Sequence, residues 1–178
     1  MNGSTEGLTP QQLSDRAVIV DLTRRMAEHV DLLQWDRLDS CFTDDLTVNC
    51  SNVLGVDRGH VETSAAEFAE AWRRTVGGFE ATQHFIANHR VRVAEEGSAA
   101  TCTAYVQAHH YYANGAGDPL WTFGGHYDFD LVRASGTADN EISGWLINGF
   151  MTTYLWEAGN RYLLEQAAER TPTRPDRQ

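Results

Sequence analysis

The sequence predicts a single α+β domain in which helices pack on one face of a curved antiparallel sheet. Helical patterns crowd the first half of the chain, while strand patterns separated by short polar turns fill the second half. Helices followed by consecutive hairpins are typical of the α+β class. A curved sheet closed by helices forms a cone with one open mouth, which is a natural pocket for a small molecule. We expect this domain to span residues 10–165, between flexible ends at 1–9 and 166–178.

Three helices are expected before the main part of the sheet. Thr9 precedes a proline and so makes a favourable N-cap, and apolar residues then recur at helical spacing to about residue 33. A second, short helix is expected over residues 35–42. Ser64 is followed three residues later by Glu67, which is a capping-box pattern, and the apolar stripe that follows predicts a third helix with one buried face.

The strands are expected to form a meander. A short strand is predicted at 46–49, and longer ones at 82–93, 99–112, 120–133 and 142–154. Polar or glycine-rich turns separate the four long strands. The sequence therefore predicts three consecutive hairpins in one antiparallel sheet.

Composition excludes several functional classes. With 42% apolar residues, the 178-residue chain can fill one sizeable core. It contains no apolar run of about 18 residues that could span a membrane. The net charge of −11 argues against nucleic acid and anionic lipid as partners. All 14 basic residues are arginines, which excludes lysine chemistry such as a Schiff base.

The cysteines and the N-terminus point to a reducing compartment. Cys41, Cys50 and Cys102 are odd in number and form no CxxC pair, so neither a disulfide scaffold nor a thiolate zinc site is expected. Residues 1–9 lack the hydrophobic core of a signal peptide. We therefore expect a cytoplasmic protein whose thiols stay reduced.

Polar residues follow the alternation of two neighbouring strands. His84 shares one face of its strand with Asn88, and His109 shares one face of the next strand with Tyr105 and Gln107. If the two strands pair, His84 and His109 can face the same space. Such groups on an apolar sheet face are costly to bury unless they meet a ligand, a water molecule or one another.

Asp31 is a second candidate for chemistry. It lies near the end of the first expected helix between Val30 and Leu32, where a carboxylate would face the sheet. If it meets His84, the aspartate orients the imidazole and stabilises its cation, and the histidine moves protons. A hydrogen-bonded core histidine and a solvated aspartate are the alternatives that the sequence leaves open.

Several short motifs occur in a characteristic order. They are the run from Val30 to Leu38, the Thr-Gln-His-Phe run at 82–85, the strand of His109, and the pairs Gly125-His126 and Gly144-Trp145. With these motifs the chain resembles, over roughly residues 12–157, the SnoaL-like branch of the NTF2-like (cystatin-like) superfamily. That branch contains scytalone dehydratase and hexachlorocyclohexane dehydrochlorinase. The resemblance implies the cone fold, a catalytic dyad of Asp31 and His84, and an assisting histidine at His109.

The chain also departs from the pattern of these relatives. Val30 and Cys50 stand where the dehydratase has two tyrosines, and Phe129 and Leu131 stand where it has a serine and an asparagine. Met26 stands where the dehydrochlorinase has a lysine. The expected catalytic base is therefore present. Much of the set of polar side chains that the relatives use for a polyhydroxylated ring or for halide elimination is absent.

These observations predict a cofactor-independent acid–base lyase, dehydratase or cyclase with a small, largely apolar substrate of the polyketide or terpenoid kind. Asp31, His84 and His109 are the expected catalytic residues. We expect no metal, no cofactor and no partner except the substrate and further copies of the chain, as a trimer or dimer. The expected pocket walls are Asn49, Phe68, Trp72, Asn88, Tyr105, Gln107, Trp121, Phe129 and Phe150.

Two other classes stay open. One is a non-catalytic binding protein or a structural subunit, like the β chain of ring-hydroxylating dioxygenases. The other is an epoxide-opening hydrolase or cyclase that would use Asp128, Asp130 and Arg133, although alternation places Arg133 on the face opposite to the two aspartates. Convergence of His84, His109 and His126 on a metal is a further, weaker alternative.

Overall fold

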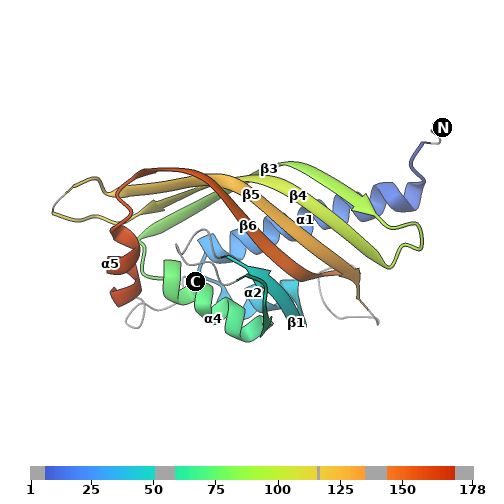
Figure 1. Cartoon of the computed structure of the whole chain (residues 1–178), viewed down its shortest axis with the longest axis horizontal. Coiled ribbons are helices and arrows are strands. Elements are labelled where there is room, and N and C mark those ends of the chain that lie inside the picture. Colours follow the sequence, from blue (N-terminus) through green and yellow to red (C-terminus); the bar gives the residue numbers. More distant parts are fainter. Residues whose placement is uncertain (1–6, 51–58, 116, 135–143, 171–178) are drawn as a thin grey trace.

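A computed structural model describes residues 7–50, 59–115, 117–134 and 144–170. Helices and one mixed, curved sheet form an α+β fold, as the sequence predicts (Figure 1). Along the chain the elements are α1 (Pro10–Asp31), α2 (Trp35–Leu38), the 3-10 turn η1 (Asp39–Cys41), β1 (Phe42–Asn49), β2 (Val61–Ser64), α4 (Ala65–Val76), β3 (Ala81–Val93), β4 (Ala99–Tyr111), β5 (Leu120–Arg133), β6 (Trp145–Gly159) and α5 (Leu163–Arg170).

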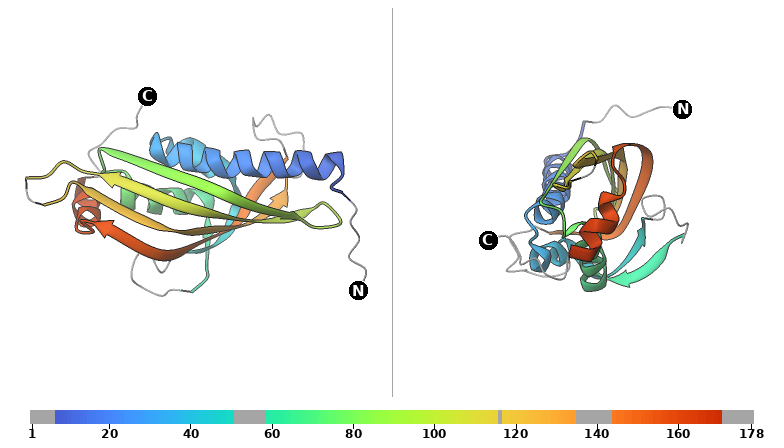
Figure 2. Two further views of the ribbon diagram at one scale, coloured as in Figure 1. Left: turned by 90° about the horizontal axis from the view of Figure 1, so that it is seen from above. Right: turned by 90° about the vertical axis from the view of Figure 1, so that its left-hand side faces the viewer.

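The six strands are ordered β2-β1-β6-β5-β4-β3. The three predicted hairpins are confirmed, because β3 to β6 pair antiparallel in succession. The expectation of a purely antiparallel sheet is wrong, since β1 runs parallel to β6 after a long crossover. Strand β2, which was not expected, pairs antiparallel with β1 at the edge. Figure 2 shows the sheet twisted and arched, with α1 lying along it.

Local signals explain where the helices begin. The Thr9 side chain accepts a hydrogen bond from the backbone N–H of Gln12, whose own side chain bonds back to Thr9. Ser64 and Glu67 form the same reciprocal capping box at the start of α4. Within the described residues, no helix is both long enough and apolar enough to cross a membrane.

Helix α5 corrects the expected end of the domain. Residues 166–170, which we expected in a flexible tail, belong to this helix, and Leu163 and Ala167 on its inner side are buried. Gly78 lets the helix dock, because a Cβ at this position would lie 1.9 Å from the carbonyl oxygen of Ala167. At the end of the helix, Arg170 contacts Glu80 at 3.2 Å. The helix thus closes one end of the cone.

At the other end of the cone, a buried carboxylate holds helix α1 to the sheet. Asp15 on α1 is 4% exposed and accepts hydrogen bonds from the Trp145 indole at 3.1 Å and the Arg133 guanidinium at 2.8 Å. Burial alone would raise the pKa of Asp15, but the bonds from Trp145, Arg133 and Gln11 outweigh it and lower the pKa. Asp15 therefore ties the start of α1 to the far ends of β5 and β6.

Replacing Asp15 by alanine should lower the free energy of unfolding by about 3 kcal/mol, because the buried indole N–H and the guanidinium lose their acceptor. Urea denaturation measures the loss. Asp21→Ala is the matched control, since Asp21 forms an exposed pair with Arg25 and should cost under about 1 kcal/mol. Equal losses in the two variants would contradict a structural role for the buried carboxylate.

Candidate active site

Asp31 is the last residue of α1 and faces the edge strand β3. After it the chain turns sharply at Leu33, which has a φ of 58°. Oδ1 of Asp31 accepts hydrogen bonds from the Thr82 hydroxyl at 2.8 Å and from the His84 ring Nδ1 at 2.6 Å. Oδ2 accepts one from the His84 backbone N–H at 2.8 Å. The edge position of β3 leaves this N–H free for the carboxylate. The predicted contact between Asp31 and His84 is confirmed.

The charge of this pair follows from its partners. Burial would raise the pKa of Asp31, but the His84 ring, its backbone N–H and the Thr82 hydroxyl together lower it. Asp31 is thus a carboxylate at neutral pH and can only accept hydrogen bonds, which places the proton of neutral His84 on Nδ1. The lone pair of His84 is left on Nε2. The His84 side chain is only 2% exposed, and it lines an internal pocket.

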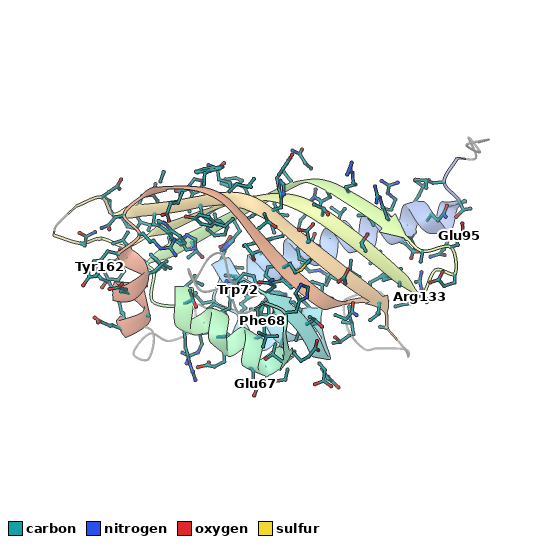
Figure 3. All side chains as sticks on the ribbon, in the orientation of Figure 1. Glu67, Phe68, Trp72, Glu95, Arg133 and Tyr162 are labelled. Atoms are coloured by element: carbon teal, nitrogen blue, oxygen red, sulfur yellow. The ribbon has the colours of Figure 1, made fainter. Side chains whose placement is uncertain are left out.

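The pocket lies between the inner face of the sheet and helices α4 and α5, is partly open to solvent, and has a cavity volume of about 110 Å³. Figure 3 shows Phe68 and Trp72 on the side of α4 that faces the sheet, with Glu67 on the opposite side. The aromatic rings of Phe68, Trp72 and Phe150 lie 5.4–5.6 Å apart. The walls are Cys50, Phe68, Ala71, Trp72, Thr75, Val76, His84, His110, Trp121, Phe123, Tyr127, Phe150, Thr152 and Leu164.

A second histidine, His110 on β4, faces this pocket. It is 1% exposed, and its ring centroid lies 5.6 Å from that of His84 and 4.7 Å from that of Trp121. Its Nδ1 is buried and has no hydrogen-bond partner among the described residues. Burial, together with the neighbouring His84, lowers the pKa of His110 to about 3. His110 is therefore a neutral imidazole at physiological pH, with one nitrogen available to a ligand.

The pKa of His110 predicts a pH dependence of stability. Between pH 6.5 and 3 the unfolded chain binds a proton at this residue and the folded chain does not, so stability falls as the pH drops through this window. The slope is at most about 1.4 kcal/mol per pH unit. His110→Leu should remove this contribution, which urea denaturation at pH 7, 6 and 5 would measure. Parallel curves for wild type and variant would contradict the buried neutral state.

His109 does not lie where we expected. In the ladder it pairs with Gln83, whereas His84 pairs with Ala108, and directly opposed residues share a face of the sheet. His109 therefore lies on the outer face, where its Nδ1 contacts the Thr122 hydroxyl at 2.9 Å. The prediction that His109 shares the pocket with His84 is wrong.

Three expected wall residues are also corrected. Tyr105 and Gln107 lie exposed on the outer face of β4, because alternation along the strand puts them on the same face as His109. Asn88 is exposed because a bulge interrupts β3 there, and its φ is 55°.

The remaining expected wall residues divide into two groups. Phe68, Trp72, Trp121 and Phe150 line the pocket. Phe129 is buried behind Phe150, at 5.5 Å between ring centroids, and half-buried Asn49 lies outside the lining. The nine other wall residues were not expected at the pocket, and they include His110, Tyr127, Thr152 and Leu164.

The residues of the epoxide-opening and metal alternatives do not converge. Asp128 accepts a hydrogen bond from Thr103 on the outer face, and Arg133 is bound to Asp15 at the far end of the sheet. His126 also lies on the outer face, where its ring is tilted against that of Tyr105 with 4.6 Å between centroids, while His84 faces inward. Within the described part of the chain, no group of three or more His, Cys, Asp or Glu residues is arranged to hold a metal ion.

Comparison with known proteins identifies one family model, the SnoaL-like domain, which matches residues 11–148. No curated protein matches the chain. The solved structure of the Kfla4162 protein from Kribbella flavida is 29% identical, covers 88% of this chain and 98% of its own, and superposes with a TM-score of 0.72.

Two more distant structures share the fold. A candidate scytalone dehydratase from Novosphingobium aromaticivorans DSM 12444 is 17% identical, with coverage of 86% and 93% and a TM-score of 0.69. Hexachlorocyclohexane dehydrochlorinase LinA-type3 from Novosphingobium barchaimii LL02 is 18% identical, with coverage of 84% and 92% and a TM-score of 0.62.

Proposed function

The chain belongs to the SnoaL-like domain family within the NTF2-like superfamily, and on this premise we propose that it is a cofactor-independent acid–base enzyme of the lyase, dehydratase or cyclase type. The observation that carries the proposal is the 2.6 Å contact between Asp31 and His84 at the wall of an otherwise apolar pocket. A carboxylate-bound imidazole whose second nitrogen opens into such a pocket is suited to abstract a proton.

In the proposed reaction, Nε2 of His84 removes a proton from a carbon or hydroxyl of the substrate. The resulting imidazolium is stabilised by the Asp31 carboxylate, which its other nitrogen already contacts. Thr82 and the His84 backbone N–H hold the carboxylate in position through two further hydrogen bonds. The same His84 can return its proton to the leaving group or to another carbon, which makes elimination, cyclisation and isomerisation variants of one step.

We assign to His110 the part that the sequence suggested for His109. Its free Nδ1 can form one hydrogen bond to a substrate oxygen and so fix the reacting end beside His84. Because its pKa is near 3, His110 is not charged at neutral pH and acts as a hydrogen-bonding group rather than as the acid.

The pocket walls favour a substrate with a largely apolar body. Aromatic and aliphatic side chains form most of the lining, and its polar groups are few. Val30 and Leu131, at two of the departures from the dehydratase pattern, are buried in the core, and Cys50 at a third lies in the wall. A polyhydroxylated ring would leave several hydroxyls without partners here, which costs binding free energy. We therefore propose a polyketide- or terpenoid-like substrate with one carbonyl or hydroxyl near the two histidines.

A panel of ligands tests this proposal. Apolar polyketide- and terpenoid-like compounds that carry one carbonyl or hydroxyl are compared with polyhydroxylated aromatic rings, by calorimetry for binding and by NMR for turnover. Binding and conversion should be confined to the apolar compounds. Efficient dehydration of the polyhydroxylated rings alone would contradict the proposed substrate class. Binding without conversion, together with a tight partner chain found by mass spectrometry, would favour the non-catalytic subunit.

A further inference from the structure

The pocket has a second group of polar side chains besides the two histidines. Tyr127 on β5, Thr152 on β6 and Cys50 directly after β1 all contribute to its lining. Tyr127 and Thr152 are directly opposed in the β5–β6 ladder, so their side chains share the inner face of the sheet and lie next to each other. The Thr152 hydroxyl in turn contacts the Cys50 sulfur at 3.9 Å. The three residues therefore form one polar row, which we call the distal row.

The Tyr127 hydroxyl is the unusual member of the distal row. The residue is only 2% exposed, and its ring packs edge-on against Phe150 and Phe129, with 4.9 and 6.2 Å between centroids. Its hydroxyl, however, forms no hydrogen bond within the described part of the chain. A buried hydroxyl without a partner costs free energy, and a buried tyrosine usually finds one. Because Tyr127 lines the pocket, the pocket is where a partner for this hydroxyl can lie.

The distal row is neutral at physiological pH and offers both hydrogen-bond roles. Burial, to which Cys50 and Asp31 add, raises the pKa of Tyr127 above its usual value, so the phenol keeps its proton and can donate it. Burial likewise raises the pKa of Cys50 to about 11. The Thr152 hydroxyl donates toward the Cys50 sulfur, which leaves the Thr152 oxygen able to accept. A ligand hydroxyl beside this row can therefore accept from Tyr127 and donate to Thr152.

The distal row lies away from the histidines, beyond an aromatic middle part of the pocket. In the ladders, the partner of Tyr127 on β4 lies four residues from the partner of His84 on the same strand. The two backbone positions are thus separated by ~14 Å along the strands and by ~10 Å across them. The Trp72 and Phe150 rings lie between, with 6.4 Å from His84 to Trp72 and 5.4 Å from Trp72 to Phe150 between centroids. The pocket therefore has two polar ends and an apolar middle.

From this arrangement we propose that the substrate carries a second oxygen, a hydroxyl group at the end opposite to the reacting one, and that Tyr127 and Thr152 bind it. The reacting end at His84 and His110 is that of the proposed function, on which this assignment rests. The substrate hydroxyl accepts a hydrogen bond from the Tyr127 phenol and donates one to the Thr152 oxygen. A ligand with an apolar group at this end leaves the Tyr127 hydroxyl unpaired, so the pocket discriminates against it. The substrate class is thereby narrowed to elongated, largely apolar molecules with an oxygen at each end.

Two matched pairs of ketones test the distal row. The short pair is indanone with and without a hydroxyl on its benzene ring, and the long pair is phenylcyclohexanone with and without a hydroxyl at the para position of its phenyl ring. Measured by calorimetry, the wild-type chain should bind the hydroxylated member of at least one pair about 10-fold more tightly than the unsubstituted member. In Tyr127→Phe this preference should fall to within about twofold, and Thr152→Val should reduce it about threefold, because each variant removes one hydrogen bond.

Tyr105→Phe is the matched control, because it removes the same hydroxyl from an exposed position on the outer face of β4 and should keep the full preference. Thermal melts separate a role in binding from a role in folding. Since the Tyr127 hydroxyl has no partner among the described residues, Tyr127→Phe should melt at the wild-type temperature or above it. A preference that survives in Tyr127→Phe would overturn the proposal. Hydroxylated ketones that bind no more tightly than their unsubstituted partners would also overturn it.

The same ketones report separately on the proposed function. Their α-protons are acidic, and NMR in heavy water follows the exchange of these protons that Nε2 of His84 should catalyse. Exchange that depends on His84, without any preference that depends on Tyr127, would overturn the distal hydroxyl and leave the acid–base function in place. A preference that depends on Tyr127, without exchange, would support the distal hydroxyl and contradict the acid–base function.

Discussion

Replacing His84 by alanine should lower turnover about 10³–10⁴-fold, because the imidazole is the only proton carrier that we assign at the reacting end of the pocket. Asp31→Asn should cause a loss of similar size. An asparagine with its oxygen in the place of Oδ2 can still accept the hydrogen bond from the His84 backbone N–H, and its NH2 group can donate to the Thr82 hydroxyl oxygen, so we expect the fold to be kept. It cannot stabilise an imidazolium, and its amide group can donate to the ring and select the wrong tautomer.

The double variant distinguishes a dyad from two independent groups. If Asp31 acts only through His84, the double variant should lose little more than the worse single variant. Turnover is measured on the best substrate of the panel, after thermal melts have shown that each variant is folded. His60→Ala and Asp36→Asn are matched controls, because both side chains are exposed, and both should keep wild-type turnover. A loss of turnover in the double variant equal to the product of the two single losses would contradict the dyad.

Local signals made much of the fold predictable from sequence. The caps at Thr9 and Ser64 need only residues within one helical turn, so the starts of α1 and α4 could be predicted. The long strands β3, β4 and β5 follow alternation and turn composition to within one residue at each end. The parallel pairing of β1 with β6 and the docking of α5 depend on contacts between distant segments, which leave no local pattern.

The error at His109 has a single physical cause. The β3–β4 hairpin begins with Val93 opposite Ala100, and a regular ladder continued from there would place His84 opposite His109. A bulge at Asn88 inserts one extra residue into β3, and every later pair shifts by one position. The neighbouring histidine of β4 therefore turns to the pocket. Asparagine tolerates a positive φ, but this weak preference does not by itself predict a bulge.

The one-residue shift in β3 places His110 at the pocket and His109 on the outer face, so a variant of His109 is the control for the same variant of His110. His110→Leu should lower turnover about 10²–10³-fold, because the substrate oxygen loses the hydrogen bond that we assign to Nδ1. Leucine is apolar and fills much of the same space, so the pocket stays closed and the buried site loses no charge. His109→Leu makes the identical change one residue earlier, on the outer face, and turnover should stay within about twofold of wild type. Light scattering would verify that the variants and the wild type are compared in the same oligomeric state.

Whether kcat or KM changes in the His110 variant shows what His110 does. If its hydrogen bond strengthens as charge develops on the substrate oxygen, kcat falls while KM changes little; a bond that only holds the substrate raises KM. Because the pKa of His110 is about 3, its removal should leave the acid limb of the pH–rate profile above pH 5 in place. An acid limb that disappears with His110 would identify it as a titrating acid or base. Equal effects at residues 109 and 110 would mean that neither histidine touches the substrate.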